Sequence, residues 1–329
     1  MLALTFAHGR ASLAERPCPV PGPGEALLKV RMAGICRTDI ELLEGYYDFA
    51  GIPGHEFVAQ VVTAPDAPGM VGRRVTADIN IGCGACPGCA AGDARHCPER
   101  TVVGIKGRDG ALAQFLALPL KNLHVIDESI PDQEAVFAEP LAAALQITQQ
   151  VHITGRMRVL VQGDGKLGLL AALALRHFAP DVTLLGRHAG KLALAVRAGV
   201  STALLPGPDE RAAFLAGLGR FDLVVEATGR PEGLDQALSL TRPRGVLVAK
   251  TTSRLPATFN LARLVVDEIS LIGSRCGDTA LALDFLKDRR VDVRPLATAV
   301  FPFDRVIEAL DAARAPGAGK ILVDMRDMS

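Results

Sequence analysis

The sequence contains no tryptophan, and phenylalanine and tyrosine together supply only 4% of its 329 residues. Few side chains are therefore available to stack on nucleic-acid bases. An excess of charge is also missing, because 36 lysine and arginine residues balance 36 aspartate and glutamate residues. Without a net positive charge, nothing in the composition marks the molecule as a partner of nucleic acid or of an anionic membrane.

Long apolar runs are missing as well. The longest candidate, Leu167–Leu175, is far shorter than the roughly 18 uninterrupted apolar residues of a membrane span. The first residues, MLALTFAHGRAS, lack a basic segment followed by an apolar core, so we expect no signal peptide. We therefore expect a cytoplasmic protein without a membrane partner, and in a reducing compartment clustered cysteines are more often metal ligands than disulfides.

The residues that are present have the composition of a globular protein. Hydrophobic residues make up 49% and charged residues 22% of the chain, whose length allows two domains that each bury a core. Residues 1–140 are rich in glycine, proline and short β-branched runs, which are typical of strands separated by turns. From residue 141 an apolar strand, a turn and a helix recur, as in 158–178, 181–199 and 221–241. This alternation predicts an α/β domain with a parallel sheet covered on both faces. Residues 294–325 predict a further strand, helix and strand, and periodicity leaves open whether these close the parallel sheet or return to the first domain.

A glycine motif follows the first strand of the α/β region. Gly163, Gly165 and Gly168 have the spacing G-x-G-x-x-G after the strand Val159–Gln162, and a predicted helix begins within the motif. The first glycine permits a tight turn, the second lets a pyrophosphate approach the backbone, and the third lets the helix pack close to the strand. The free N–H groups of the helix N-terminus favour the phosphates. The motif predicts a dinucleotide site, although a turn that only tightens a strand–helix connection is the alternative.

The end of the next strand indicates which dinucleotide is bound. NAD sites place an acidic residue about 20 residues after the glycines, where it bonds the ribose 2′-hydroxyl. This chain has Gly186 there, followed by Arg187 and His188. A missing carboxylate removes repulsion of a 2′-phosphate, and an arginine can bond it in bidentate fashion, so we expect NADP(H) in preference to NAD(H). The alternative is that Arg187 is a solvated turn residue, and Asp164 within the glycine turn has no explanation at this stage. The complete set of candidate cofactor residues is Gly163, Gly165, Lys166, Leu167, Gly168, Gly186, Arg187, His188 and Thr228.

Four of the seven cysteines fall within fifteen positions. They form the segment CGACPGCAAGDARHC at residues 83–97, and the ligand candidates are Cys83, Cys86, Cys89 and Cys97. Four thiolates complete the tetrahedral shell of Zn²⁺, which leaves no open position, so we expect a structural zinc site. Redox-active C-x-x-C pairs are an alternative, but such pairs do not come as a triplet followed by a fourth cysteine. A zinc ribbon that binds nucleic acid is a second alternative, which the scarcity of nearby basic and aromatic residues disfavours.

A second group of candidate ligands is more dispersed. Cys36, His55 and Glu56 lie in the first region, and Glu139 lies at its end. One cysteine, one histidine and one or two carboxylates can hold zinc with a position left for water or substrate. Each residue alone has an ordinary structural interpretation, since a lone cysteine is more often a small buried hydrophobe.

In these segments the chain resembles the zinc-dependent medium-chain alcohol dehydrogenases, including the polyol, threonine and glucose dehydrogenases. The segments that carry the resemblance occur in the family's order and are GICRTD, GHEFVAQV, CGACPGCAAGDARHC, AEPLAAAL, GDGKLG and GKILV. The resemblance implies a GroES-like, mostly β catalytic domain and a Rossmann domain with a doubly wound parallel sheet. It places the catalytic domain in residues 1–140 and 281–329 and the Rossmann domain in residues 141–280.

The resemblance also implies roles for individual residues. Cys36, His55 and Glu56 resemble the catalytic zinc ligands, and Glu139 resembles a variable fourth group. Asp39 resembles the carboxylate that orients the ligand histidine. Thr38 resembles the hydroxyl that relays the alcohol proton, and Glu41 stands where many relatives have a relay histidine. The implied reaction is hydride transfer between a small alcohol, polyol or sugar and the nicotinamide cofactor, with one catalytic and one structural zinc.

Other interpretations remain at this stage. A quinone or enoyl reductase of the same fold is one, but such relatives generally lack the zinc ligands that this chain keeps. A non-catalytic relative that binds dinucleotide or nucleic acid is another, although it needs neither an open metal site nor a proton relay. By resemblance we expect a homodimer or homotetramer, and residues 268–277, EISLIGSRCG, are the candidate edge strand of the interface.

Overall fold

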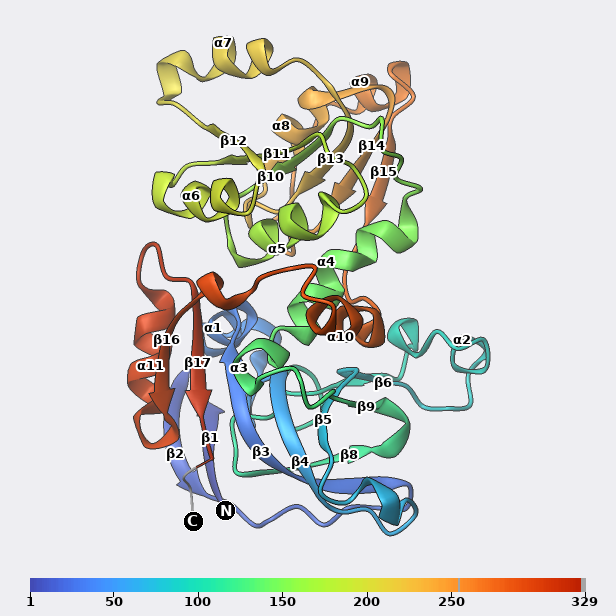
Figure 1. Ribbon diagram of the computed structural model, residues 1–329, viewed down its shortest axis with the longest axis vertical. Coiled ribbons are helices and arrows are strands. Elements are labelled where there is room, and N and C mark those ends of the chain that lie inside the picture. The colour runs from blue at the N-terminus through green and yellow to red at the C-terminus, as the bar shows by residue number, and fades with distance from the viewer. Residues whose placement is uncertain (254, 327–329) are drawn as a thin grey trace. The chain divides into compact units, whose positions relative to one another are not determined.

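The computed structural model describes residues 1–253 and 255–326 (Figure 1). The chain divides into two compact units. The first unit comprises residues 1–139, 279–289 and the chain from 293 onward, and the second comprises residues 140–278 and 290–292. The prediction of a mostly β domain together with a doubly wound α/β domain is confirmed, because one unit holds a mainly antiparallel sheet and the other a parallel sheet.

The first unit is built on a sheet centred on the long strand β3. The strand order is β16-β17-β3-β4-β5-β9, and β8 also pairs with β3. The strands are β3 (Glu25–Ile35), β4 (Glu56–Thr63), β5 (Arg74–Ala77), β8 (Phe115–Pro119), β9 (Leu123–Val125), β16 (Ala297–Pro302) and β17 (Lys320–Asp324). Alternate β3 residues Ala26, Leu28, Val30 and Met32 are buried, which is the period-2 pattern of a strand with one core face. β17 runs antiparallel to β3, with Ile321 opposite Ile35, so the last predicted strand joins the sheet of the first unit.

Several smaller elements complete the first unit. A hairpin is formed by β1 (Leu2–Ala7) and β2 (Arg10–Glu15), and a short ribbon is formed by β6 (Asn80–Ile81) and β7 (Thr101–Val102). The helices are α1 (Arg37–Leu43), α2 (Pro87–Ala90), α3 (Asp132–Ala135), α10 (Thr279–Lys287) and α11 (Val306–Arg314). The cysteine segment lies between β6 and β7. Figure 1 shows β17, in red, beside the blue β3, which illustrates how distant parts of the chain share this sheet.

The second unit contains the parallel sheet that the alternation predicts. The order of its strands is β12-β11-β10-β13-β14-β15, and neighbouring strands are parallel. The strands are β10 (Val159–Gln162), β11 (Val182–Gly186), β12 (Ser201–Leu204), β13 (Phe221–Glu226), β14 (Thr241–Ala249) and β15 (Ser270–Gly273). The helices are α4 (Ala138–Gln150), α5 (Lys166–Leu175), α6 (Ala189–Arg197), α7 (Pro208–Leu218), α8 (Gly233–Leu240) and α9 (Leu261–Val266), and α4 begins just before the boundary of the unit.

The strand order reverses between β10 and β13, which is where a doubly wound sheet offers a crevice at the carboxyl ends of its strands. Val159, Leu160 and Val161 of β10 are fully buried, as expected for a central strand covered on both faces. The last strand in this order, β15, pairs with β14 alone among the described residues. The segment 268–277, which the sequence analysis names as an edge strand, therefore contains an edge of this sheet. None of the helices in the described part of the chain combines the length and apolar character that crossing a bilayer requires.

Candidate functional site

The three motif glycines each meet a different spatial demand. Gly163 has φ +118°, and a Cβ there would lie 2.5 Å from the Ala227 carbonyl oxygen. A Cβ on Gly168 would lie 1.9 Å from the Gly163 carbonyl oxygen, so α5 could not pack as close to the turn. A Cβ on Gly165 would meet nothing within 4 Å, because this position faces open space at the N-terminus of α5. The turn is therefore tight on one side and accessible on the other, as phosphate binding requires.

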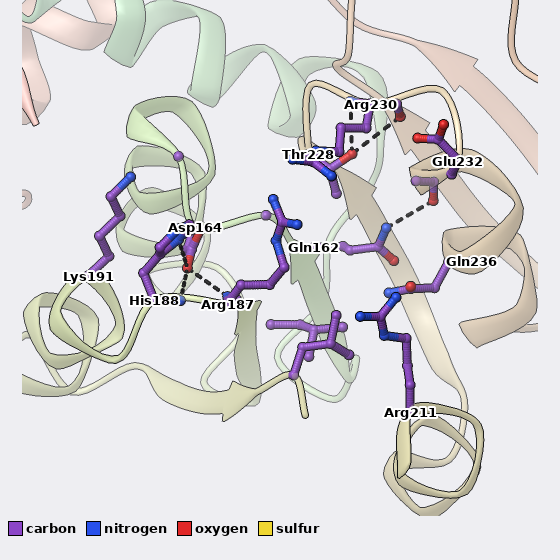
Figure 2. A pocket seen from close by; sticks show the side chains of 16 residues that line it. Gln162, Asp164, Arg187, His188, Lys191, Arg211, Thr228, Arg230, Glu232 and Gln236 are labelled. Atoms are coloured by element: carbon purple, nitrogen blue, oxygen red, sulfur yellow. Dashed lines mark hydrogen bonds and ion pairs between the residues drawn. The ribbon is translucent and has the colours of Figure 1, made fainter. Parts of the chain in front are cut away.

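A pocket of 380 Å³ opens at this turn, at the carboxyl ends of β10, β11 and β13 (Figure 2). Four cationic side chains line it, namely those of Arg187, Lys191, Arg211 and Arg230. Figure 2 shows Arg187 extending away from the glycine turn toward the middle of the pocket. The remaining lining residues are Gln162, Gly163, Asp164, Gly165, Leu185, Gly186, His188, Leu205, Thr228, Glu232, Gly233 and Gln236. The surplus of cations suits a ligand with several negative charges.

Six of the nine candidate cofactor residues line this pocket, and three do not. The three that do not line it form the first turn of α5 and are Lys166, Leu167 and Gly168. Sequence reasoning missed three of the four cationic residues of the pocket, namely Lys191, Arg211 and Arg230. Lys191 could have been found, because it follows Arg187 by four residues and lies in the first turn of α6. Arg211 could not, because α7 brings it from a part of the sequence without any motif.

Asp164, unexplained in the sequence, turns toward the end of β11. Its Oδ2 accepts the N–H groups of Arg187 and His188 at 2.7 Å each, and His188 Nδ1 lies 3.0 Å from both of its oxygens. Burial alone would raise the pKa of the Asp164 carboxyl, but the bonds from His188 and Arg187 outweigh it and hold the pKa below its usual range. The carboxylate is therefore charged, and it is already bonded to the backbone of the turn that follows β11.

Thr228 follows β13 on the other side of the pocket. Its N–H and its hydroxyl both donate to Glu226 Oε1, at 2.8 and 2.6 Å, and Glu226 is only 1% exposed. The hydroxyl also accepts the Arg230 N–H at 3.1 Å. This network fixes the loop that carries Arg230 into the pocket (Figure 2).

In the first unit, strand pairing brings Cys36, His55 and Glu56 together. Cys36 is the residue before α1 and directly follows β3, while Glu56 begins β4. Gly34 of β3 lies opposite Glu56 in the antiparallel register, and a Cβ on Gly34 would lie 2.6 Å from Glu56 Oε2. The glycine thus leaves room for the carboxylate beside Cys36. One candidate ligand atom from each of Cys36, His55 and Glu56 lies within 4.8 Å of the others.

Asp39 is fully buried and contacts the segments that carry Cys36 and His55. Its Oδ2 accepts the Cys36 N–H at 2.8 Å, its Oδ1 accepts the Gly54 N–H at 3.1 Å, and Oδ1 lies 3.5 Å from His55 Nδ1. The carboxylate therefore positions the backbone on both sides of the group and faces one ring nitrogen of His55. Burial alone would lower the pKa of His55, but the charges of Asp39 and Cys36 outweigh it and raise the pKa well above its usual value.

A buried cation completes the surroundings of Glu56. The Lys320 ammonium of β17 donates to Glu56 Oε2, and their side chains are 2% and 1% exposed. Burial opposes the charge of Lys320, but the charges of Glu56, Cys36 and Glu139 outweigh it and raise the pKa of the ammonium. Glu139 is half-buried near Lys320 and is not part of the close group that the described residues form around Cys36.

Thr38 and Glu41 lie on α1, which begins directly after Cys36. The Thr38 hydroxyl oxygen is 3.8 Å from Cys36 Sγ, so it borders the ligand group. Glu41 Oε1 is 3.3 Å from Arg37 Nε, and the Glu41 side chain is 26% exposed. The helix therefore leads from the ligand group to a carboxylate in contact with solvent.

The donor set of this group fits zinc. A thiol, an imidazole and a carboxylate converge, and three such ligands leave a tetrahedral position open. Zinc-binding histidines usually bond a carboxylate or carbonyl through their other ring nitrogen, and Asp39 Oδ1 lies 3.5 Å from His55 Nδ1, which makes no hydrogen bond among the described residues.

The cysteine segment folds into a second, closed group. Ligand atoms of Cys83, Cys86, Cys89 and Cys97 lie within 4.8 Å of one another. Gly82 is required at the edge of the group, because a Cβ there would lie 2.5 Å from Cys89 Sγ. The N–H groups of Ala85 and Cys86 lower the pKa of the Cys83 thiol to about 6. A bond from the Gly84 backbone is outweighed by burial and the neighbouring thiols, which raise the pKa of Cys89 to about 11. The four sulfurs match the set expected for structural zinc.

The comparisons with known proteins cover most of the chain. Residues 22–128 match the family described as alcohol dehydrogenase GroES-like domain, and residues 167–288 match the family described as zinc-binding dehydrogenase. The L-threonine 3-dehydrogenase of Streptomyces avermitilis is 32% identical over 330 residues, which cover 95% of this chain and 95% of the relative.

Two solved structures are similar over nearly the whole length. One is described as a short chain alcohol dehydrogenase of Escherichia coli CFT073 complexed with NADH, with a TM-score of 0.92 and 26% identity over 99% of both chains. The other is a putative zinc-binding dehydrogenase of Sinorhizobium meliloti 1021 bound to NADP, with a TM-score of 0.87 and 28% identity over 98% of this chain and 99% of that one.

Proposed function

The chain belongs to the zinc-dependent medium-chain alcohol dehydrogenase family, and on that premise we propose that it transfers a hydride between NADP(H) and an alcohol, polyol or sugar hydroxyl, or the matching carbonyl. The observation that carries the proposal is the convergence of Cys36, His55 and Glu56, whose thiol, imidazole and carboxylate suit an open zinc site. A quinone or enoyl reductase or a dinucleotide sensor has no use for this group.

We assign the residues of the group the following roles. Cys36, His55 and Glu56 hold the zinc, and Glu139 is the variable fourth group. Zinc supplies a Lewis acid that lowers the pKa of the substrate hydroxyl. Asp39 orients His55 through its position 3.5 Å from Nδ1.

The proton of the alcohol needs a path to solvent. The Thr38 hydroxyl borders the ligand group and would accept this proton as it releases its own, which Glu41 would receive at the surface of α1. Both assignments rest on the order of these residues along one helix that begins at Cys36.

For the cofactor we propose NADP(H) in preference to NAD(H). In support, Gly186 leaves no acidic side chain at the end of β11, and Arg187, Lys191, Arg211 and Arg230 line one pocket. The solved relatives include one with NADH and one with NADP, so similarity does not decide between the cofactors.

The four-cysteine group is proposed to hold a second, structural zinc, which is consistent with its closed set of sulfur ligands. Thiolate ligands must remain reduced, which supports a cytoplasmic location. We also propose a homodimer or homotetramer that associates through the edge strand β15, beside which Val265 and Val266 of α9 are 65% and 79% exposed.

Elemental analysis and cofactor titration test this proposal together. The purified protein should contain two zinc ions per chain, and it should bind NADP⁺ more tightly than NAD⁺. Arg187→Ala should reduce that preference about tenfold, the loss of one charge-assisted contact, whereas Arg197→Ala should not, because Arg197 is exposed at the far end of α6. An unchanged preference in Arg187→Ala would refute the NADP(H) assignment. A panel of alcohols, polyols and sugars screened for NADPH formation then identifies the substrate class.

A further inference from the structure

Asp164 and Gly186 compete for one space in the cofactor pocket. A Cβ on Gly186 would lie 2.6 Å from both Cβ and Oδ2 of Asp164 and 2.8 Å from its Cγ. Real Cβ atoms do not approach other atoms so closely, and the backbone around Asp164 belongs to the tight glycine turn. The carboxylate from the glycine turn therefore occupies the volume into which a side chain at the end of β11 would project.

The contacts of Asp164 order the turn that follows β11. Two consecutive N–H groups, those of Arg187 and His188, donate to the same oxygen at 2.7 Å. His188 is the residue before α6, and its own side chain does not cap that helix. Asp164 thus fixes the backbone from which the Arg187 side chain enters the pocket (Figure 2). A side chain held by a fixed backbone loses less entropy when it binds a ligand.

The charge of Asp164 is directed into this turn. Its side chain is 9% exposed, and its oxygens face the two N–H groups and the imidazole of His188. Four cations of the pocket, Arg187, Lys191, Arg211 and Arg230, make no ion pair with it among the described residues. The pocket thereby contains a carboxylate close to the ribose-binding position and still presents positive charge to an incoming anion.

From these contacts we infer that Asp164 is a specificity-determining positioning residue that raises the preference for NADP(H) over NAD(H). It does so by ordering Arg187 and His188 around the 2′-phosphate and by excluding an acidic side chain from position 186. The inference rests on the proposed dinucleotide function of the pocket. It assigns Asp164 the opposite effect from the acidic residue of an NAD site, which bonds the ribose directly.

Binding measurements on the purified, zinc-loaded protein test this inference. Isothermal titration gives the affinities for NADP⁺, NAD⁺, adenosine 2′,5′-bisphosphate and 5′-AMP. Asp164→Ala should weaken binding of NADP⁺ and of the bisphosphate about tenfold or more, because two bonds from N–H to a charged acceptor are lost. Binding of NAD⁺ and 5′-AMP should change by less than about threefold, so the preference falls. Asp164→Asn keeps one acceptor oxygen at the two N–H groups and should recover part of the preference.

A double-mutant cycle tests the shared space. Gly186→Asp alone should weaken binding of both cofactors, because its side chain meets the Asp164 carboxylate. Asp164→Gly combined with Gly186→Asp removes the Cβ of residue 164 as well as its carboxylate, so this variant should bind NAD⁺ better than Gly186→Asp alone and should reverse the preference. Thermal unfolding of each variant separates these effects from a loss of fold, since a folding defect lowers affinity for all four ligands together.

Two results would overturn the inference. One is a preference for NADP⁺ that stays within threefold of wild type in Asp164→Ala. The other is tighter NADP⁺ binding by Asp164→Asn, which would show that the carboxylate repels the 2′-phosphate. A wild-type protein that prefers NAD⁺ would refute the NADP(H) assignment alone, because the inference is judged by the change in the ratio of affinities. A wild-type protein that binds none of the four ligands would refute the proposed function itself.

Discussion

The ammonium of Lys320 is bonded to the carboxylate of Glu56, and both side chains are almost completely buried. The two residues come from opposite ends of the sequence, since β17 brings Lys320 next to β3 and β4. A buried carboxylate needs either this cation or another positive charge. If Glu56 is a zinc ligand, the metal is that second charge.

We therefore expect Lys320→Met to destabilise the zinc-free protein by about 3–5 kcal/mol, the cost of leaving a buried charge unpaired. The double variant Lys320→Met/Glu56→Gln should recover much of this loss, because no charge is then left alone. In zinc-loaded protein the effect of Lys320→Met should be clearly smaller. Urea unfolding of wild type and both variants, each with and without a chelator, measures these differences. Equal destabilisation with and without zinc would argue against Glu56 as a ligand.

The four-cysteine group should hold one zinc independently of the other site. Cys97→Ser should lower the zinc content from two to one per chain and reduce the unfolding temperature, because Cys97 is fully buried within the group. Gly82→Ala should lower the same zinc occupancy, since its Cβ would press on Cys89 Sγ. Cys18→Ser is the matched control, because Cys18 is exposed and outside both groups. Two zinc ions retained in Cys97→Ser would exclude this site.

The proposed proton path predicts different effects for its two members. Thr38→Ala should lower kcat about 100-fold without weakening cofactor binding, and Thr38→Ser should restore most of the rate, since it keeps the hydroxyl. Glu41→Gln should change the pH–rate profile, because it removes the carboxylate that receives the proton. Stopped-flow rates between pH 5 and 10 provide the profile. If Glu41→Gln matches wild type throughout, Glu41 is not the relay base.

The contacts of Asp78 predict that part of the free energy of unfolding depends on pH. Burial alone would raise the pKa of its carboxyl, but bonds from His124 and Thr279 outweigh burial and hold the pKa below its usual range. A lowered folded-state pKa stabilises the protein above the unfolded value of about 3.9, and this contribution is lost as the pH falls through the folded-state pKa. Because the side chain is 42% exposed, solvent screening limits the contribution to roughly 1 kcal/mol.

Asp78→Asn should therefore be less stable than wild type at pH 7, and the difference should shrink as the pH falls below about 3.9 and vanish below the folded-state pKa of Asp78. Asp209→Asn, an exposed position on α7, serves as the control and should show no comparable difference. Chemical unfolding at several pH values is the measurement. A difference that persists unchanged in acid would contradict the assignment of this effect to the Asp78 charge.

The edge of the parallel sheet predicts the oligomeric state. Leu271 of β15 is 39% exposed, and the exposed valines of α9, Val265 and Val266, come shortly before it in the sequence. Leu271→Lys combined with Val266→Glu should convert the proposed dimer into monomers, because charges at an edge strand oppose pairing with a second copy. Val196→Glu is the control, since Val196 is 55% exposed on α6. Sedimentation analysis gives the answer, and an unchanged oligomer in the double variant would place the interface elsewhere.

The sequence predicts the alternating second unit well because each of its elements has a local signal. Val159–Gln162 is an apolar run, the glycines mark the turn, and the helix follows at once. The four-cysteine group is equally local. By contrast, Lys320 gives no sequence signal as the partner of Glu56, because the two positions meet only through long-range pairing of β17, β3 and β4.

Asp164 shows a different limit of prediction. The sequence shows a carboxylate within the glycine turn and none at position 186, and no motif connects the two observations. Only the structure reveals that the first residue fills the space left by the second. Side-chain direction in a tight turn depends on the neighbouring strand, so motif spacing could not supply it.

The late position of β17 has a consequence for biosynthesis. The second unit is nearly continuous in sequence, so it can fold as soon as residue 278 has left the ribosome. The sheet of the first unit must wait for residues 320–324, although most of its strands are made first. During that interval the part of β3 that pairs with β17 and the Glu56 carboxylate that bonds Lys320 both lack their partners, so we expect this unit to be the one that depends on chaperones during synthesis.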